Sequence, residues 1–137
     1  MKYTIAILLV THFVADFLMQ SREMGKKKSS EPIWLLQHLI IQYCVFTIVL
    51  LPFFDLHHVT LFVIFNTIIH GVIDWNIWRF YKAYAYRAIA KNPKHPLLTE
   101  NPAEPWKYWE DHWFYATIGF DQGLHSITLI FLGYWLL

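Results

Sequence analysis

Long apolar stretches, separated by short polar connectors, dominate the pattern of hydrophobic and polar positions along the chain. Four of them approach the roughly 20 mainly apolar residues that a helix needs to cross a lipid bilayer. No internal repeat of about 20 to 50 residues accompanies them. The pattern therefore predicts a single all-α domain over residues 1–137, a four-helix transmembrane bundle with spans at residues 3–20, 32–54, 59–78 and 113–136.

The connector between the third and fourth spans is longer than the others and amphipathic. Residues 78–90 mix aromatic with basic side chains, which suits a cytoplasmic extension of span three or a helix lying among the lipid headgroups. Prolines then interrupt residues 92–105, where no regular element is expected. Residues 106–113 are aromatic again and predict an interfacial anchor for span four. The aromatic content fits an interfacial belt, and the alternative is a lid or substrate-facing surface over the cytoplasmic mouth.

The N-terminal stretch begins like a signal peptide. However, its apolar run continues through His12 and Asp16, and no convincing small-residue cleavage motif follows. We therefore expect an uncleaved first span.

Composition supports the membrane class. Hydrophobic residues make up 56% of the chain and charged residues only 15%, whereas about a quarter of a soluble domain is charged. The net charge of +1 gives no indication of a nucleic-acid partner. Cys44 is the only cysteine, so an internal disulfide and a cysteine-based metal cage are both excluded.

Basic residues are confined almost entirely to the first and third connectors. Since cytoplasmic loops of membrane proteins carry an excess of Lys and Arg, these two connectors are predicted to be cytoplasmic. The protein would then be a multi-pass inner-membrane protein with both termini outside the cytoplasm. Ten of the eleven basic residues support this orientation, with Lys2 as the exception: Arg22, Lys26, Lys27, Lys28, Arg79, Lys82, Arg87, Lys91, Lys94 and Lys107.

Three of the apolar segments each contain a histidine and an aspartate four residues apart. Residues i and i+4 lie on one face of a helix, so the two side chains of each pair can reach the same point. In the predicted orientation each Asp lies nearer the cytoplasm than its His. The third pair has the reverse order in the sequence, which preserves this layering because its span runs the opposite way. The pairs are His12 with Asp16, His70 with Asp74, and Asp121 with His125.

Burying these groups is costly. One aspartate inside a spanning helix costs about 2.5 to 3.5 kcal/mol on insertion scales. The three carboxylates are therefore expected to face one another, a water-filled cavity or a cation. Gly71, Gly119 and Gly123 lie nearby and are predicted to let helix backbones approach closely.

Three interpretations of the pairs remain open. Imidazole and carboxylate are the usual non-thiol ligands of zinc, manganese and iron, so the pairs could hold one divalent transition-metal ion or a carboxylate-bridged pair. Chains of intramembrane Asp and His also form proton or ion pathways in transporters. The third interpretation is interhelical hydrogen bonding that only holds the bundle together. A metal site is the favoured hypothesis, since mixed His and Asp ligation without cysteine suits catalysis.

In a catalytic site of this kind, all six residues would be metal ligands. One of the carboxylates of Asp16, Asp74 and Asp121 would also act as the catalytic base for water held by the metal. The complete ligand set is His12, Asp16, His70, Asp74, Asp121 and His125.

Neighbouring polar residues are assigned supporting roles. Gln20, His38 and Gln122 would orient the ligands from behind. His38 lies about six residues inside span two, on the same helical face as Gln42, and is placed in this supporting set rather than as a further ligand. The lysine run of residues 26–28 indicates topology and contact with anionic lipid, and it could also attract a phosphate.

These blocks have a familiar arrangement. The stretch from His12 to Gln20 (HxxxDxxxQ), the pair His70 and Asp74, and the stretch from Asp121 to His125 (DQxxH) together resemble a family of small bacterial and phage membrane proteins of unknown function. The resemblance covers nearly the whole chain. It implies a four-span inner-membrane protein and no established activity. The motif type also resembles, more loosely, that of membrane-bound metal-dependent hydrolases, which is an analogy only.

The hypothesis that follows is a membrane-embedded metal-dependent hydrolase acting on a lipid or another membrane-associated substrate. The alternatives are an oligomeric ion or proton channel or transporter subunit, and a non-enzymatic membrane protein that binds a partner. Four short spans enclose little volume, so transport would require a homo-oligomer.

Overall fold

The computed structural model is all-helical and describes residues 2–101 and 104–137. An isolated bridge between Leu98 and Trp106 is the nearest approach to a sheet in this part of the chain. The elements follow one another as α1 (Lys2–Phe13), the π-helix η1 (Val14–Leu18), α2 (Arg22–Lys27), α3 (Pro32–Leu50), α4 (Leu56–Lys91), the 3-10 helix η2 (Tyr108–Glu110) and α5 (His112–Leu136). The all-α class is confirmed.

Helices occur at each of the four predicted spans, but only part of the membrane prediction is supported. Among the described helices, α3 and α4 are long and apolar enough to cross a membrane, and a shorter apolar helix covers Tyr3–Leu18. Length and apolar composition thus support two membrane-crossing helices and not the four predicted.

Capping residues explain where the helices begin. Pro32 opens α3 at a position where a missing N–H costs nothing. The Asp55 carboxylate accepts hydrogen bonds from the backbone N–H of His57 and His58, which starts α4. Asp111 accepts from the N–H of Trp113 at 2.9 Å and starts α5.

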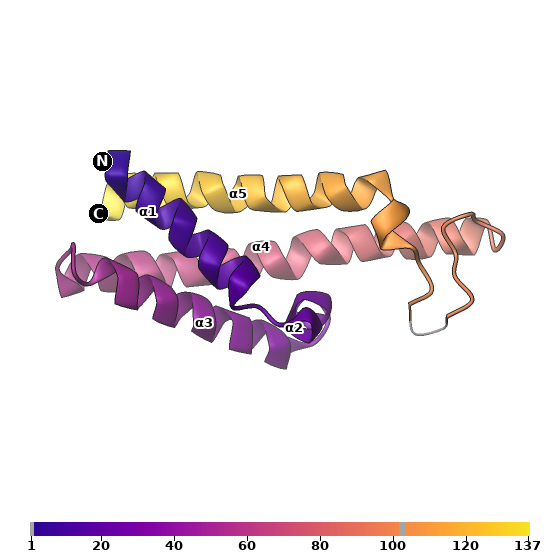
Figure 1. Ribbon diagram of the computed structural model, residues 1–137, viewed down its shortest axis with the longest axis horizontal. Coiled ribbons are helices and arrows are strands. Elements are labelled where there is room, and N and C mark those ends of the chain that lie inside the picture. The colour runs from indigo at the N-terminus through magenta and orange to yellow at the C-terminus, as the bar shows by residue number, and fades with distance from the viewer. Residues whose placement is uncertain (1, 102–103) are drawn as a thin grey trace.

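Helix α4 is the central element and continues without a break to Lys91. Residues 78–90 therefore continue the helix of the predicted third span, which agrees with one of the two arrangements expected for them. Helices α3 and α5 pack along α4, and α1 crosses between α3 and α5 (Figure 1). The two termini lie together at one end of the molecule, and the 92–111 connector lies at the other.

Two apolar clusters fill the interior at opposite ends. The larger is formed by α1, α3, α4 and α5 near the termini, and its buried members are Leu8, Phe46, Leu50, Val59, Phe62, Val63, Leu129 and Leu132. The smaller joins the end of α4 to the connector through Tyr81, Ala85 and Trp106. The polar residues singled out in the sequence lie between these two clusters.

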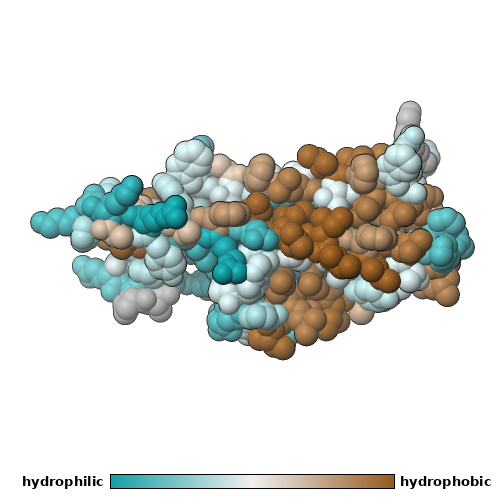
Figure 2. Space-filling model, turned by 180° about the vertical axis from the view of Figure 1, so that it is seen from behind, coloured by the Kyte–Doolittle hydropathy of each residue, from teal (hydrophilic) through white to brown (hydrophobic). Residues whose placement is uncertain are grey.

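The outer surface is also divided. On the face seen in Figure 2, apolar side chains cover the half formed by α3, α4 and α5 toward the termini, whereas hydrophilic side chains gather toward the end that contains the connector. Ile48, Ile127 and Phe131 are among the apolar residues that are more than half exposed. An apolar surface of this extent marks contact with lipid or with another protein.

The described part of residues 92–105 contains turns and no helix, as expected, while Pro102 and Ala103 lie outside the described residues. The three glycines differ in their surroundings. A Cβ atom added at Gly71 would lie 2.9 Å from Cδ1 of Leu39, so a side chain of α3 packs directly on α4 there, and the expected close approach of backbones at Gly71 stays a prediction. At Gly119 and Gly123 an added Cβ would meet nothing within 4 Å, and the expectation of close approach is wrong for both.

Candidate metal centre

The three His/Asp pairs converge in the middle of the bundle. Within each pair, a carboxylate oxygen and the imidazole Nε2 lie 3.8 Å apart for His12 and Asp16, 3.2 Å for His70 and Asp74, and 3.7 Å for Asp121 and His125. None of these six residues is more than 4% exposed. Side chains from α4 and α5 also meet, since Nε2 of His125 lies 3.7 Å from Oδ1 of Asp74.

The first pair depends on a local change of helix type. The backbone switches from α-helix to π-helix at Val14, and the N–H of Met19 bonds to the carbonyl of Val14 at 3.0 Å. Single π turns of this kind occur frequently at functional sites. The turn buries Asp16 and then ends the helix before Gln20. Gln20 therefore does not continue the helical face of His12 and Asp16, and no hydrogen bond joins it to the six residues in the described part of the chain.

His38 lies at the centre of the cluster rather than behind it. Its Nε2 is 2.9 Å from Nε2 of His70, 3.1 Å from Oδ1 of Asp16 and 3.2 Å from Oδ2 of Asp74. The side chain is fully buried. His38 therefore offers a ligand atom as directly as the paired histidines, which differs from the supporting place that the sequence suggested.

Lys28 is a member of the cluster that the sequence did not single out. Its Nζ lies 2.9 Å from Oδ2 of Asp74 and 3.3 Å from Oδ1 of Asp16, and its side chain is 5% exposed. Burial opposes the charge, but Asp74 and Asp16 together raise the pKa of Lys28 above its usual value. The sequence offered only a run of three lysines, and no rule of spacing tells which of them turns inward.

Gln122 connects α5 to the first pair. Its side-chain amide donates to Oδ2 of Asp16 at 2.8 Å and to Oδ2 of Asp121 at 3.2 Å, and its Oε1 lies 3.2 Å from Nε2 of His12. These contacts hold both carboxylates in fixed orientations. The predicted orienting role of Gln122 is compatible with them and stays a prediction.

Several buried side-chain atoms on α4 and α5 have no hydrogen-bond partner among the described residues. Among them are Oδ1 of Asp74, Oδ1 of Asp121 and Nε2 of His125. Leaving a buried polar atom unpaired costs about 1 to 3 kcal/mol, and more when it is charged. Their shared location is therefore a place where a cation would be stabilised.

Two groups of residues in this cluster could hold a metal ion. One consists of Asp16, His38, His70 and Asp74, the other of Asp74, Asp121 and His125, and within each group the candidate ligand atoms lie within 4.8 Å of one another. Ligand bonds of about 2.0 to 2.2 Å place opposite ligands about 4.4 Å apart, so small side-chain rotations would suffice. The two groups share Asp74, which could bridge a pair of ions.

His12 belongs to neither group, although it was predicted as a ligand. Its ring lies beside two other imidazoles, with centroids 4.9 Å from His125 and 5.4 Å from His70. It lies at the edge of the cluster and contacts Gln122.

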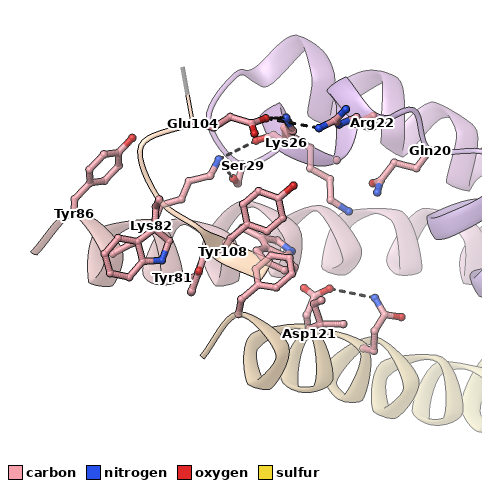
Figure 3. Close-up of a pocket in the computed structure, with 18 of the residues that line it drawn as sticks. Gln20, Arg22, Lys26, Ser29, Tyr81, Lys82, Tyr86, Glu104, Tyr108 and Asp121 are labelled. Carbon is pink, nitrogen blue, oxygen red and sulfur yellow. Dashed lines mark hydrogen bonds and ion pairs between the residues drawn. The ribbon is translucent and has the colours of Figure 1, made fainter. Parts of the chain in front are cut away.

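A cavity of about 480 Å³ leads to the cluster from the end of the molecule that contains the connector. Asp16, Asp121 and Gln122 form part of its lining. Aromatic side chains from α4 and the connector form a wall, and basic side chains of α2 and α4 lie around the mouth (Figure 3). The aromatic connector therefore faces a space next to the candidate metal ligands, and whether this surface contacts a substrate stays a prediction.

No curated protein and no solved structure matches the chain. A family profile with the description "Protein of unknown function (DUF3307)" matches residues 4–137, nearly the whole chain. The description names no activity, so function has to be argued from the site. On the extent of this match, the chain belongs to the DUF3307 family of proteins of unknown function.

Proposed function

We propose that the protein is a membrane-embedded metal-dependent hydrolase that acts on a lipid or another membrane-associated substrate. The observation that carries this proposal is the convergence of unpartnered ligand atoms of Asp74, Asp121 and His125 beside a cavity wide enough for a small substrate.

The charges of the cluster support a divalent cation. Three aspartates are buried within it, and Lys28 forms ion pairs with two of them, Asp16 and Asp74. If the three carboxylates are ionised and the imidazoles neutral, one ammonium leaves two negative charges uncompensated. Buried charges are normally paired or coordinate metals, because an isolated one is strongly destabilising. One divalent ion would balance the two that remain.

Asp74, Asp121 and His125 would hold this ion, and Asp16, His38 and His70 surround the neighbouring position that Lys28 approaches. A zinc, manganese or iron ion there would polarise a substrate carbonyl or phosphoryl oxygen and make water more acidic.

The protein's own side chains divide the remaining tasks by location. Asp16 and Asp121 line the cavity, so either carboxylate can accept a proton from water at the substrate, whereas Asp74 is fully enclosed and is restricted to binding. Gln122 fixes both of these carboxylates through its amide. The apolar walls exclude bulk water, which strengthens every charge interaction in the site.

The proposal includes the four-span arrangement in the inner membrane. The four spans would be α1 together with η1, α3, α4 and α5. Both termini would lie outside, and α2 and the connector would lie in the cytoplasm. The apolar exterior of the bundle and the hydrophilic end in Figure 2 support this orientation, as does the placement of the basic residues. The cavity would then open at the level of the lipid headgroups.

Metal analysis tests the proposal. The protein, purified in detergent without added chelator, is expected to contain at least one transition-metal ion per chain by mass spectrometry. Asp121→Asn keeps the size of the side chain and removes a ligand charge, so the metal content should fall. Asp55→Asn is the matched control, because Asp55 caps α4 at an exposed position outside the cluster.

Metal-free protein that is well folded by circular dichroism would overturn the hydrolase. So would an Asp121→Asn variant that retains the same metal content as Asp55→Asn.

A second candidate function is a proton pathway, which one observation favours. The imidazoles form a continuous chain, with Nε2 of His38 2.9 Å from Nε2 of His70 and the ring of His70 stacked on that of His125 at 4.1 Å between centroids. The test reconstitutes metal-free protein into liposomes and measures proton flux. Flux that is present in this protein and lost in the His38→Gln variant would support a proton pathway over hydrolysis.

A further inference from the structure

We propose that the cavity binds an amphiphile with a phosphate headgroup, and that the phosphate lies against Arg22, Lys26 and Lys82 at the mouth. This inference names the substrate class of the hydrolase and depends on that proposal only for turnover, since binding can be measured without it. It is argued from three features of the cavity: its wall, an ammonium without an anionic partner, and a carboxylate at the mouth.

The wall of the cavity is aromatic and apolar. Trp78, Tyr81, Trp106 and Phe114 line it, and Tyr81 and Trp106 belong to the buried apolar cluster of this end. A volume of about 480 Å³ is in the range of small-molecule sites, which are mostly apolar with a few polar groups that fix orientation. Such a space suits the first carbons of a lipid chain and excludes a folded macromolecule.

Lys82 lies on the cavity lining without an acidic partner. Its Nζ donates to the carbonyl of Lys26 at 3.0 Å and to the hydroxyl oxygens of Ser29 at 2.8 Å and Ser30 at 2.9 Å. These acceptors are all neutral, and no carboxylate of the described residues lies within ion-pair distance of Lys82. Burial lowers the pKa of Lys82, although Glu31 acts in the opposite sense. An anion at this position would compensate the charge.

A carboxylate already marks an anion position at the mouth. Glu104 of the connector pairs with Lys26 and lies 3.8 Å from a guanidinium nitrogen of Arg22 (Figure 3). All three side chains are partly exposed, and ion pairs of this kind contribute little stability. A phosphate offers more charge and more acceptor oxygens than a carboxylate, and arginine binds it in a bidentate manner. It can therefore displace Glu104 from the two cations.

The acidic residues of the cavity determine which end of the ligand goes where. Asp16 and Asp121 belong to the cluster and line the inner end of the cavity, where they repel an anion in the absence of a bound metal ion, whereas the basic side chains lie at the mouth. The phosphate therefore stays at the mouth, and the uncharged part of the amphiphile occupies the space between the aromatic wall and the candidate metal ligands.

Calorimetry on the full chain in dodecyl maltoside tests the inference with three ligands. Dihexanoyl phosphatidic acid has both the phosphate and the chains, dihexanoyl phosphatidylcholine has a zwitterionic headgroup, and glycerol 3-phosphate has no chains. We expect phosphatidic acid to bind at least about tenfold more tightly than either of the others. If glycerol 3-phosphate binds equally well, the wall contributes nothing and the site is one for soluble phosphates, which overturns the proposal. If phosphatidylcholine binds equally well, the basic residues do not select the anionic headgroup and the proposal fails.

Substitutions of a basic and of an acidic residue at the mouth should change the affinity for phosphatidic acid in opposite directions. Lys82→Gln removes the unpaired charge and should weaken binding of phosphatidic acid about tenfold or more, because hydrogen bonds to charged groups are stronger than those between neutral groups. Lys27→Gln is the matched control, since Lys27 pairs with Glu23 and Glu31 and is not part of the lining. Glu104→Gln removes the competing carboxylate and should tighten binding.

An equal effect of Lys82→Gln and Lys27→Gln would overturn the inference. Should Lys82→Gln fail to fold, Glu104→Gln decides, because a purely structural ion pair would leave binding unchanged or weaker. Asp121→Asn separates the two proposals: it should lose metal and still bind phosphatidic acid. If the protein contains metal but does not bind phosphatidic acid, this inference is wrong, whereas the hydrolase proposal stands.

Discussion

The ammonium of Lys28 lies 2.9 Å from Oδ2 of Asp74, and both side chains are almost completely buried. Lys28 caps the short helix α2, whereas Asp74 belongs to the middle of α4. The ion pair therefore ties the first connector to the centre of the bundle. It also brings the one cation of the cluster to a carboxylate that both candidate metal groups share.

Replacing Lys28 by methionine should strongly destabilise the protein. The substitution keeps the length of the side chain but leaves Asp74 and Asp16 without their cation, and breaking a buried ion pair costs about 3 to 5 kcal/mol. The free energy of unfolding can be measured in mixed micelles by circular dichroism. Lys27→Met is the control, because the Lys27 side chain is 41% exposed. Equal stability of the two variants would contradict a buried role for Lys28.

Much of the cluster follows from the sequence, for a physical reason. A spacing of four residues fixes a common face of a helix wherever that helix packs, and the high cost of a buried carboxylate requires the faces to meet. Those two facts predict that Asp16, Asp74 and Asp121 come together. They need no knowledge of loop geometry.

The remaining members of the cluster depend on geometry that the sequence does not encode locally. Lys28 enters because a short helix, capped by Ser21, turns that one lysine inward. His38 has no aspartate four residues away, so its central position depends on how α3 packs on α4. Gln20 does not join the cluster because the π-helix at residues 14–18 ends before reaching it. Tertiary packing decides all three positions.

A larger side chain at Gly71 should disrupt the contact between α3 and α4. In Gly71→Val the new Cβ would lie 2.9 Å from Leu39, and overpacking typically costs about 1 to 3 kcal/mol. Gly123→Val is the matched control on α5, where an added Cβ meets nothing within 4 Å. Its stability should change by less than about 0.5 kcal/mol, since glycine and valine are both weak helix formers. Thermal unfolding of the two variants side by side measures the difference, and similar midpoints would refute the close approach.

Asp111 should hold the connector against α4. Its Oδ2 accepts hydrogen bonds from the hydroxyl of Tyr81 at 3.0 Å and from the indole N–H of Trp106 at 3.2 Å, and its Oδ1 caps α5. Asp111→Ala loses the cap and leaves two buried donors unpaired, at a cost of about 2 to 4 kcal/mol. Tryptic cleavage after Lys94 should accelerate accordingly.

Glu110→Ala is the control for this prediction, because Glu110 is half exposed and contacts only Lys107 at 3.9 Å among the described basic residues. Cleavage at equal rates in the two variants would show that Asp111 does not anchor the connector.

The proposed orientation predicts which exposed positions a membrane-impermeant maleimide can reach in intact bacterial cells. Cys44 is the only cysteine and is exposed on α3, so Cys44→Ser gives an unreactive background. On it, His57→Cys tests the short connector without Lys or Arg, and Ala90→Cys tests the basic end of α4. Because the membrane potential and anionic lipids retain Lys and Arg on the cytoplasmic side, His57→Cys should react in intact cells and Ala90→Cys only after lysis. Reaction of both from outside would show that α4 does not cross the membrane, and the reverse pattern would place the cavity and its basic mouth on the outer face.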